Sequence, residues 1–355
     1  MNLSKQQEQI VKTEKTKVVV HSCAGSGKTR CLTERLKYLL DNGVDPSKIV
    51  AITFTNAAAE EIYERVGYTT NLFIGTIHSY ANRLLLSSGV NTSDILNKEE
   101  FDKLFHRVKK NPHCIQEVEH LLLDEGQDSN PNQFEFLLEM INPKNWMIFC
   151  DVRQSIYRFA GAHPDYIFEL MREFDVTTYE LNENYRSAPE ILNYARTIIR
   201  PLGIDYCDRS VSMREETRGR VLEVPYSSNG IAQTIQRYVN EGKATYADWF
   251  ILTRTNAESE KIMAALKKHD IPHTTFKKAN LDNKGLKEKM RENTVKVLTI
   301  HTAKGLEANN VIIIGARYRD KEERCISYVA ATRAKNLLVW TTRPTPKRTR
   351  TVSWE

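Results

Sequence analysis

The stretch that decides the fold is KVVVHSCAGSGKTRCL, residues 17–32, in which an apolar run leads into a turn with two glycines. Its segment SCAGSGKT fits the GxxxxGK[ST] spacing of a phosphate-binding P-loop, except that Ser22 stands where the first glycine is expected. In such a loop the backbone N–H groups face a phosphate, and the following helix adds its positive N-terminal end. Strand, loop and helix together predict a nucleotide-binding α/β domain, and a chance glycine-rich turn is the alternative.

The P-loop also predicts which residues hold ATP and Mg²⁺. Gly25 and Gly27 allow the backbone to turn toward the phosphates. Lys28 would reach the β- and γ-phosphates, and Thr29 would bind Mg²⁺ through its hydroxyl. The predicted nucleotide contacts of this segment are Ser22, Cys23, Ala24, Gly25, Ser26, Gly27, Lys28, Thr29 and Arg30.

Two adjacent carboxylates follow a second apolar run, in HLLLDEGQDSN at residues 120–130. Such a pair is costly to bury unless a cation or a chemical task uses it. In P-loop nucleotidases an acidic residue after a second strand holds Mg²⁺, a role that suits Asp124. Glu125 is the candidate general base that polarises the attacking water. A capping or surface acidic pair is the alternative.

Short apolar runs alternate with helical patterns along the 355 residues, which predicts βαβ units and parallel sheets. A first series of strands ends near residue 150, and a second begins with TYELNENY. We therefore expect two α/β domains, at residues 1–176 and 177–345, followed by a basic tail at 346–355. Polar residues 277–293 read as a linker or an exposed helix.

Composition narrows the class of protein. The net charge of +6 is compatible with a polyanionic partner but too small to argue for one. The six cysteines have no CxxC spacing, so neither a zinc site nor a disulfide framework is indicated. No apolar run approaches the length of a membrane span, and the polar N-terminus is unlike a secretory signal. These features predict a soluble protein of the cytoplasm.

Further motifs occur in a fixed order from about Leu3 to Lys335: TFTNAAAEE, GTIHSYANRLL, DEGQD, DVRQSIYRFAGA, LNENYRS, TIHTAKGLE and YVAATRAK. With the P-loop, this order resembles the UvrD/Rep family of superfamily 1 DNA helicases. The resemblance implies two RecA-like P-loop domains with parallel sheets and an ATP cleft between them. It also implies an ATP-driven motor that moves on single-stranded DNA in the 3′→5′ direction, or on tailed duplex DNA.

The resemblance carries roles over to individual residues. Gln7 is similar to the glutamine that reads adenine, Tyr185 to the residue that stacks on it, and Glu307 to the ribose contact. Gln154 resembles the γ-phosphate sensor. Arg186 and Arg333 resemble the two arginines of the second domain that reach the γ-phosphate. Positive charge there stabilises the phosphoryl oxygens as the bond breaks.

The resemblance also predicts a path for single-stranded DNA. Aromatic rings can stack on any base, and the family has aromatics in its base pockets. Each of these side chains taken alone could instead be structural, and Phe54 and Phe159 could be plain core. The predicted contacts are Thr53, Phe54, Asn56, Thr76, His78, Tyr157, Phe159, Asn256 and His301.

The sequence departs from the family in size, because the gaps at residues 79–123 and 188–298 leave no room for large accessory domains. We expect a trimmed motor, monomeric, with a small helical remnant at about 90–118. Strand separation usually needs a wedge, so the chain is either a complete helicase or a DNA-stimulated ATPase whose protein partner supplies the wedge. A third hypothesis is a non-enzymatic binding module. The intact ATP-site residues argue against the third.

Overall fold

The computed structural model describes residues 3–67, 70–276, 283–316 and 318–342. The chain divides into two compact units. The first comprises Met1–Tyr185 with Arg209–Val211, and the second comprises Arg186–Asp208 with Ser212–Glu355. The short strands β7 (Glu183–Asn184) and β8 (Val211–Ser212) lie where the chain passes from one unit to the other.

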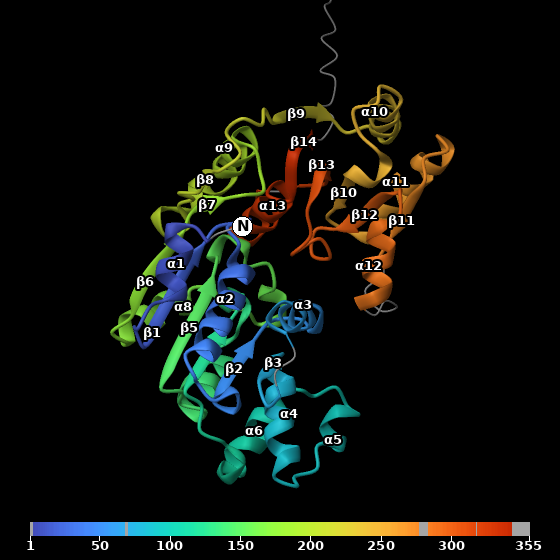
Figure 1. Ribbon diagram of the computed structural model, residues 1–355. Coiled ribbons are helices and arrows are strands. Elements are labelled where there is room, and N and C mark those ends of the chain that lie inside the picture. Colours follow the sequence, from blue (N-terminus) through green and yellow to red (C-terminus); the bar gives the residue numbers. More distant parts are fainter. Residues whose placement is uncertain (1–2, 68–69, 277–282, 317, 343–355) are drawn as a thin grey trace, which may run out of the picture. The chain divides into compact units, whose positions relative to one another are not determined.

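The first unit is built on a six-stranded parallel sheet of order β3-β2-β4-β5-β1-β6 (Figure 1). Its strands are β1 (Lys17–Ser22), β2 (Ile49–Ile52), β3 (Phe73–Gly75), β4 (His120–Leu123), β5 (Asn145–Cys150) and β6 (Thr177–Leu181). Neighbouring residues of one strand enter different cores, as Val18 and Val19 do, because side chains alternate across a sheet. A sheet that is buried on both faces reads as a continuous apolar run, which is why β1, β2, β4 and β5 were recognisable.

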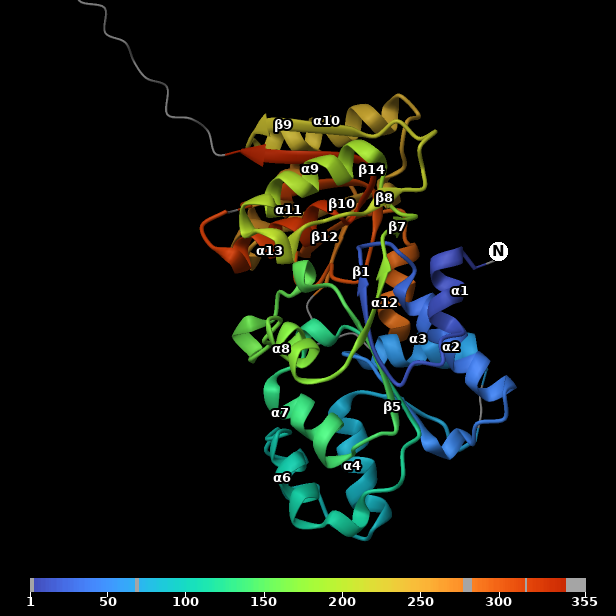
Figure 2. The same cartoon turned by 90° about the vertical axis from the view of Figure 1, so that its left-hand side faces the viewer.

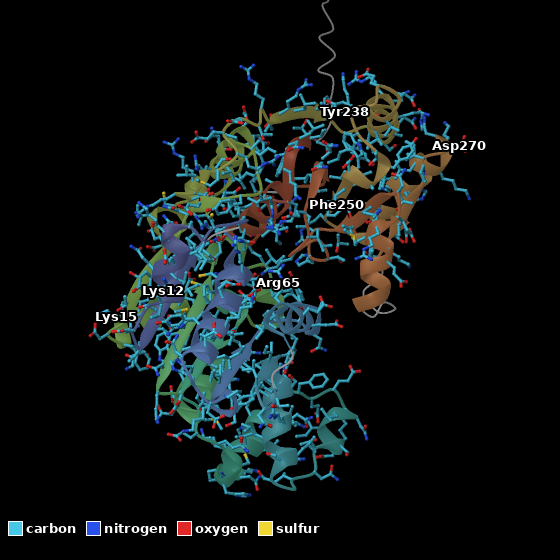
Figure 3. The ribbon with its side chains drawn as sticks, in the orientation of Figure 1. Lys12, Lys15, Arg65, Tyr238, Phe250 and Asp270 are labelled. Carbon is cyan, nitrogen blue, oxygen red and sulfur yellow. The ribbon has the colours of Figure 1, made fainter. Side chains whose placement is uncertain are left out.

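Helices cover both faces of this sheet (Figure 2). One core includes α1 (Lys5–Val11), α2 (Lys28–Asp41) and α3 (Asn56–Val66). The other includes α4 (Ile77–Ser87), α5 (Ser93–Leu96), α6 (Lys103–Lys110), α7 (Pro131–Phe134), the π-helical η4 (Glu135–Met140) and α8 (Tyr166–Glu173). Long charged side chains such as Lys12, Lys15 and Arg65 lie on the surface (Figure 3).

The second unit repeats this plan with a parallel sheet of order β11-β12-β10-β13-β14-β9. Its strands are β9 (Arg220–Pro225), β10 (Trp249–Thr253), β11 (His273–Thr275), β12 (Val295–Thr299), β13 (Ala308–Ile314) and β14 (Ala334–Thr342). Its helices are α9 (Pro189–Ile199), α10 (Ser228–Asn240), α11 (Asn256–Lys268), α12 (Asn283–Arg291) and α13 (Lys321–Ala331). The helices α10 and α11 pack on one face, and Phe250 is buried within the sheet (Figure 3).

The predicted α/β class with parallel sheets is confirmed, and the first compact unit extends beyond the predicted domain boundary at residues 176 and 177. Thr177–Leu181 forms β6 and pairs with β1, so the first unit reaches Tyr185 rather than residue 176. The helices α5 and α6 lie in the segment where a helical remnant was expected, and α12 lies within the predicted linker or helix. Residues 277–282 of that linker and the basic tail at 346–355 lie outside the described residues. No described helix is both long enough and apolar enough to cross a membrane.

Candidate active site

The P-loop joins β1 to α2 and has the backbone geometry of a phosphate cradle. Gly25 and Gly27 take positive φ angles of 69° and 77°, in the left-handed region that glycine favours. A side chain at Gly27 would also lie 2.9 Å from the Gln7 amide nitrogen. That amide donates to the Ser26 carbonyl at 3.1 Å, so Gln7 braces the loop. Thr29 lies in the first turn of α2, whose N-terminal N–H groups have no side-chain cap.

The end of β6 and the chain that follows it hold the other side of the P-loop. Three hydrogen bonds tie them to the loop: Cys23 N to Leu181 O, Asn184 Nδ2 to Ala24 O, and Tyr185 N to Gly25 O. They place Tyr185 beside the loop with 45% of its surface exposed, and its hydroxyl donates to Glu183 at 2.8 Å. An exposed ring at this position is available for stacking on a flat ligand.

Lys28 and the first two carboxylates of DEGQD, Asp124 and Glu125, form one charged cluster. The Lys28 Nζ lies 2.6 Å from Glu125 and 3.9 Å from Asp124. Burial alone would lower the pKa of Lys28, but the charges of Glu125 and Asp124 outweigh it and raise that pKa above its ordinary value. Glu125 has a φ of 54°, which a residue other than glycine rarely adopts. Such local strain is typical of functional positions.

Gln127, for which the motifs predicted no role, links this cluster to the motif DVRQS. It is completely buried in η3 (Gly126–Asp128), where its side-chain amide donates to the Glu125 carboxylate. The oxygen of the same side-chain amide, Oε1, accepts a hydrogen bond from the Asp151 backbone N–H at 2.9 Å. Asp151 in turn accepts a 2.7 Å hydrogen bond from the side chain of Gln154, the predicted γ-phosphate sensor. One chain of contacts therefore connects the predicted general base to the predicted sensor.

The same network explains why serine can replace glycine at the start of the P-loop. The Ser22 hydroxyl donates to the Cys150 carbonyl at 2.9 Å and joins β1 to β5. Arg153, in η5 (Val152–Gln154), donates to the Ser22 carbonyl at 2.8 Å and to Asp151 at 2.6 Å. Asp151 and Arg153 belong to the motif DVRQS, so the sequence could have indicated both residues. Their contacts could not be predicted from it, because these depend on β1 lying beside β5.

The residues of this unit fit ATP with Mg²⁺. The Ser26 hydroxyl is buried in the loop and has no hydrogen-bond partner among the described residues. The Lys28 ammonium is held at the loop by carboxylates, in a position to exchange them for phosphate oxygens. Magnesium binds through one or two protein ligands plus substrate phosphates, and Thr29 with Asp124 matches that donor set.

The three aromatic residues predicted to contact DNA lie together on the first unit. Phe54 stacks on Tyr157 with ring centres 4.8 Å apart, and Tyr157 meets Phe159 edge-on at 6.0 Å. Phe54 and Phe159 are 41% and 74% exposed, whereas Tyr157 is buried beneath them. Exposed aromatic rings add little to a hydrophobic core, but they can stack on the bases of a single strand. Phe54, Tyr157 and Phe159 together form the aromatic platform.

A pocket of about 150 Å³ joins this platform to the charged cluster. Its lining includes Thr53, Phe54, Thr76 and His78 together with the adjacent carboxylates Asp124 and Glu125. Ser129 and Gln133, which no sequence motif singled out, also line it. His78 lies 3.1 Å from Asp102 and stacks on Phe105, so the segment around α6 steadies this ring. Asn56 is the first residue of α3 and is exposed. It lies two residues after Phe54 in the sequence, but it does not line the pocket.

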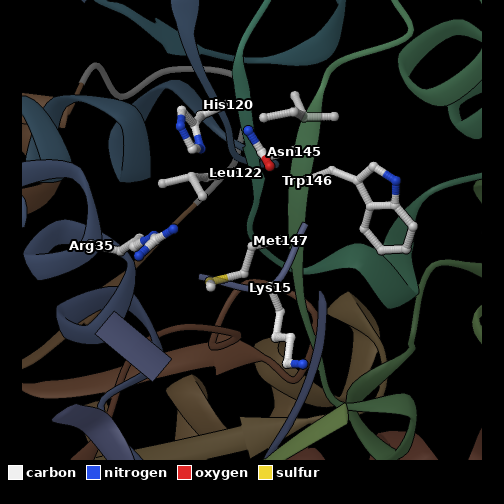
Figure 4. A pocket seen from close by; sticks show the side chains of 8 residues that line it. Lys15, Arg35, His120, Leu122, Asn145, Trp146 and Met147 are labelled. Carbon is white, nitrogen blue, oxygen red and sulfur yellow. The ribbon is translucent and has the colours of Figure 1, made fainter. Parts of the chain in front are cut away.

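A second, smaller pocket lies at the opposite edge of the same sheet (Figure 4). Lys15, His120 and Asn145 mark the amino ends of β1, β4 and β5, and Arg35 reaches in from α2. The Arg35 guanidinium donates to the Val11 carbonyl at 2.7 Å, at the C-terminal end of α1. Ligands of parallel α/β sheets bind at the carboxyl ends of the strands, so this pocket is a structural joint rather than the nucleotide site.

The second unit separates its predicted residues between two edges of its sheet. Asn256 follows β10 and His301 follows β12, at the carboxyl ends of neighbouring strands. Glu307 and Arg333 precede β13 and β14, at the opposite edge. Arg333 is 1% exposed, and its Nε donates to the Val329 carbonyl at 2.9 Å.

Arg186, Glu307 and Lys335 form an ion cluster at that second edge. One Glu307 oxygen lies 2.5 Å from the Arg186 Nε, and the other lies 2.6 Å from the Lys335 Nζ. Lys335 was not singled out from the sequence. The structure thus brings the NYRS arginine to the GLE glutamate across 121 residues of chain.

Two family models together cover almost the whole chain. The one described as UvrD/REP helicase N-terminal domain matches residues 3–111 and 95–175. The one described as UvrD-like helicase C-terminal domain matches residues 179–281 and 275–344.

Curated proteins with helicase names are similar to this chain at moderate identity. A probable DNA helicase of Mycoplasma pneumoniae is 26% identical over 95% of this chain and 82% of its own length. The ATP-dependent DNA helicase PcrA of Staphylococcus epidermidis is 26% identical over 77% of this chain and 50% of its own length. PcrA of Leuconostoc citreum is 25% identical over 77% of this chain and 49% of its own. The chain thus spans about half the length of the PcrA relatives.

Proposed function

The chain belongs to the UvrD/Rep family of helicases, and from this premise we propose that it is an ATP-dependent motor that moves 3′→5′ on single-stranded DNA and separates strands. The observation that carries the proposal is the pocket lined by both Phe54 and Glu125. A strand stacked on the aromatic platform would lie against the wall that holds the general base. The predicted DNA path and the predicted general base would then share one pocket of the first unit.

Nucleotide chemistry follows from the charged cluster. ATP would displace Glu125 from Lys28, because the γ-phosphate offers the ammonium a more highly charged partner. The released Glu125, still oriented by Gln127, would accept the proton of the attacking water. Mg²⁺, held by Thr29 and Asp124, would neutralise charge on the phosphates. We assign Arg186 and Arg333 to the γ-phosphate, the role that the family resemblance gives them.

The alternative function is a DNA-stimulated ATPase that unwinds little on its own. It is favoured by the short segment between β3 and β4, where α5 and α6 are the only α-helices after α4 among the described residues. A protein partner would then supply the wedge. In either case we expect a cytoplasmic protein that acts as a monomer on single-stranded or tailed duplex DNA.

The test is an unwinding assay on duplexes with a 3′ or a 5′ single-stranded tail, with Glu125→Gln as the control. The proposal expects ATP-dependent opening of the 3′-tailed duplex alone, abolished in the control. Opening of the 5′-tailed duplex alone would reverse the proposed polarity. DNA-stimulated hydrolysis without opening of either duplex would select the alternative.

A further inference from the structure

The ion cluster of the second unit suggests a task for Glu307 that differs from the ribose contact implied by the resemblance. Both of its carboxylate oxygens are already engaged, one with Arg186 and one with Lys335. The Arg186 guanidinium also donates to the Thr332 carbonyl at 3.2 Å. The guanidinium is therefore held at two of its nitrogens, Nε by the carboxylate and Nη1 by the backbone.

The cluster is partly buried and is not a fully exposed surface pair. The Arg186 side chain is only 13% exposed, and those of Lys335 and Glu307 are 33% and 39% exposed. Burial would raise the pKa of Glu307, but the charges of Arg186 and Lys335 outweigh it and lower that pKa to about 2. The carboxylate is therefore ionised at neutral pH, as its ion pairs with both cations require.

The backbone ties this cluster to the other predicted arginine. The N–H of Ala308, directly after Glu307, donates to the Arg333 carbonyl at 3.0 Å. Lys335 lies two residues beyond Arg333, at the start of β14. The Glu307 carboxylate therefore anchors the Arg186 side chain beside the amino ends of β13 and β14, and Arg333 directly precedes β14.

We propose that Glu307 is a positioning residue that fixes the direction of the Arg186 guanidinium, and that Lys335 anchors Glu307 for this task. This inference rests on the proposed ATPase function and adds the means by which one arginine is pre-oriented. Pre-orientation matters because a displacement of about 1 Å in a catalytic group can cost about 10²-fold in rate. Ribose recognition would be secondary or absent.

The first experiment separates the two roles by kinetics. Glu307→Gln is expected to lower kcat about 10- to 100-fold, with equal factors for ATP, 2′-deoxy-ATP and 3′-deoxy-ATP. In a double-mutant cycle, Glu307→Gln should cost little further once Arg186→Gln is present, because the two residues act as one unit. Lys335→Met should lower kcat in the same direction by a smaller factor. A raised KM with unchanged kcat, a lost preference between ATP and its deoxy analogues, and multiplicative effects with Arg186→Gln would overturn the proposal.

The second experiment does not need activity. The Nε–H signal of Arg186 in a ¹⁵N–¹H correlation spectrum, assigned through Arg186→Lys, should shift in Glu307→Gln and stay in place in Glu241→Gln. The latter removes a matched but exposed pair, in which Glu241 lies 2.6 Å from Lys243. An unmoved signal in Glu307→Gln would refute the clamp even if hydrolysis fell. A wild type that hydrolyses no ATP would refute the proposed function and leave this spectral test intact.

Discussion

Replacing Gln127 with leucine tests the link between the general base and the sensor motif. Leucine has a similar volume, so the main change is the loss of two hydrogen bonds. The Asp151 N–H would be left buried without its 2.9 Å partner, which costs about 1–3 kcal/mol. The lost donor to the charged Glu125 adds about 1.5–3 kcal/mol before water or side-chain movement compensates. We expect a net loss of about 3 kcal/mol in the free energy of unfolding of the first unit.

Activity should fall further than stability explains. A positioned general base contributes about 10²–10⁴-fold to rate, and Gln127→Leu removes the contact that orients it. We expect kcat to drop about 10- to 100-fold at a temperature where the variant is fully folded. Nucleotide affinity should change little, because the Lys28 cradle is untouched.

The assay combines urea unfolding, nucleotide titration by fluorescence and steady-state hydrolysis with single-stranded DNA. Asn132→Ala, at an exposed position on α7, serves as the control and should match wild type. If Gln127→Leu is destabilised but keeps full kcat, Gln127 is a packing residue and the proposed link is wrong. Unchanged stability together with unchanged kcat would refute the hydrogen-bond assignment as well.

Three further predictions follow from the same geometry. Lys28→Met should abolish hydrolysis and should lower the free energy of unfolding by about 3 kcal/mol, because the Glu125 carboxylate loses the Lys28 cation. The double variant Lys28→Met with Glu125→Gln should regain part of this free energy in urea unfolding, and no recovery would contradict the pairing. Phe54→Ala should weaken single-stranded DNA binding by about 1–3 kcal/mol, measured by anisotropy, without changing hydrolysis in the absence of DNA, whereas the exposed Leu86→Ala should have no effect. The pKa of Glu307 lies below its ordinary value near 4.5, so its stabilisation is complete above that pH and is lost as the pH falls toward 2. The difference in unfolding midpoint between wild type and Glu307→Gln should accordingly shrink over that interval, and a constant difference would contradict the ion pairs.

The interior strands of both sheets could be predicted because they are buried on both faces. HLLL and WMIFC are continuous apolar runs, and the P-loop fixes where β1 ends. The sequence grouped the edge strand β6 with the second series of strands because Thr177–Leu181 is not a continuous apolar run. Its residues alternate between half-buried and exposed positions, and only Leu181 is buried. Its sequence is typical of any edge strand, and only the pairing with β1 shows which sheet it completes.

The motifs predicted that Lys28 lies near Asp124 and Glu125, but not how the residues around them pair. Gln127 and Arg153 stand inside motifs that were recognised, yet their partners depend on strand order. Glu307 was carried over as a ribose contact, and its ion pair with Arg186 spans 121 positions, a distance over which no local pattern acts. Ser22 departed from the P-loop pattern without explanation until β5 was placed beside β1.

The most direct test of the central claim is the rate of ATP hydrolysis with and without single-stranded DNA, in wild type and in Glu125→Gln. The claim is that DNA on the aromatic platform stimulates a reaction in which Glu125 is the general base. We predict strong stimulation of the wild type by DNA and at least about 10²-fold slower hydrolysis by the variant, with nucleotide binding retained. Hydrolysis that is equal with and without DNA, or that survives in Glu125→Gln, would contradict it.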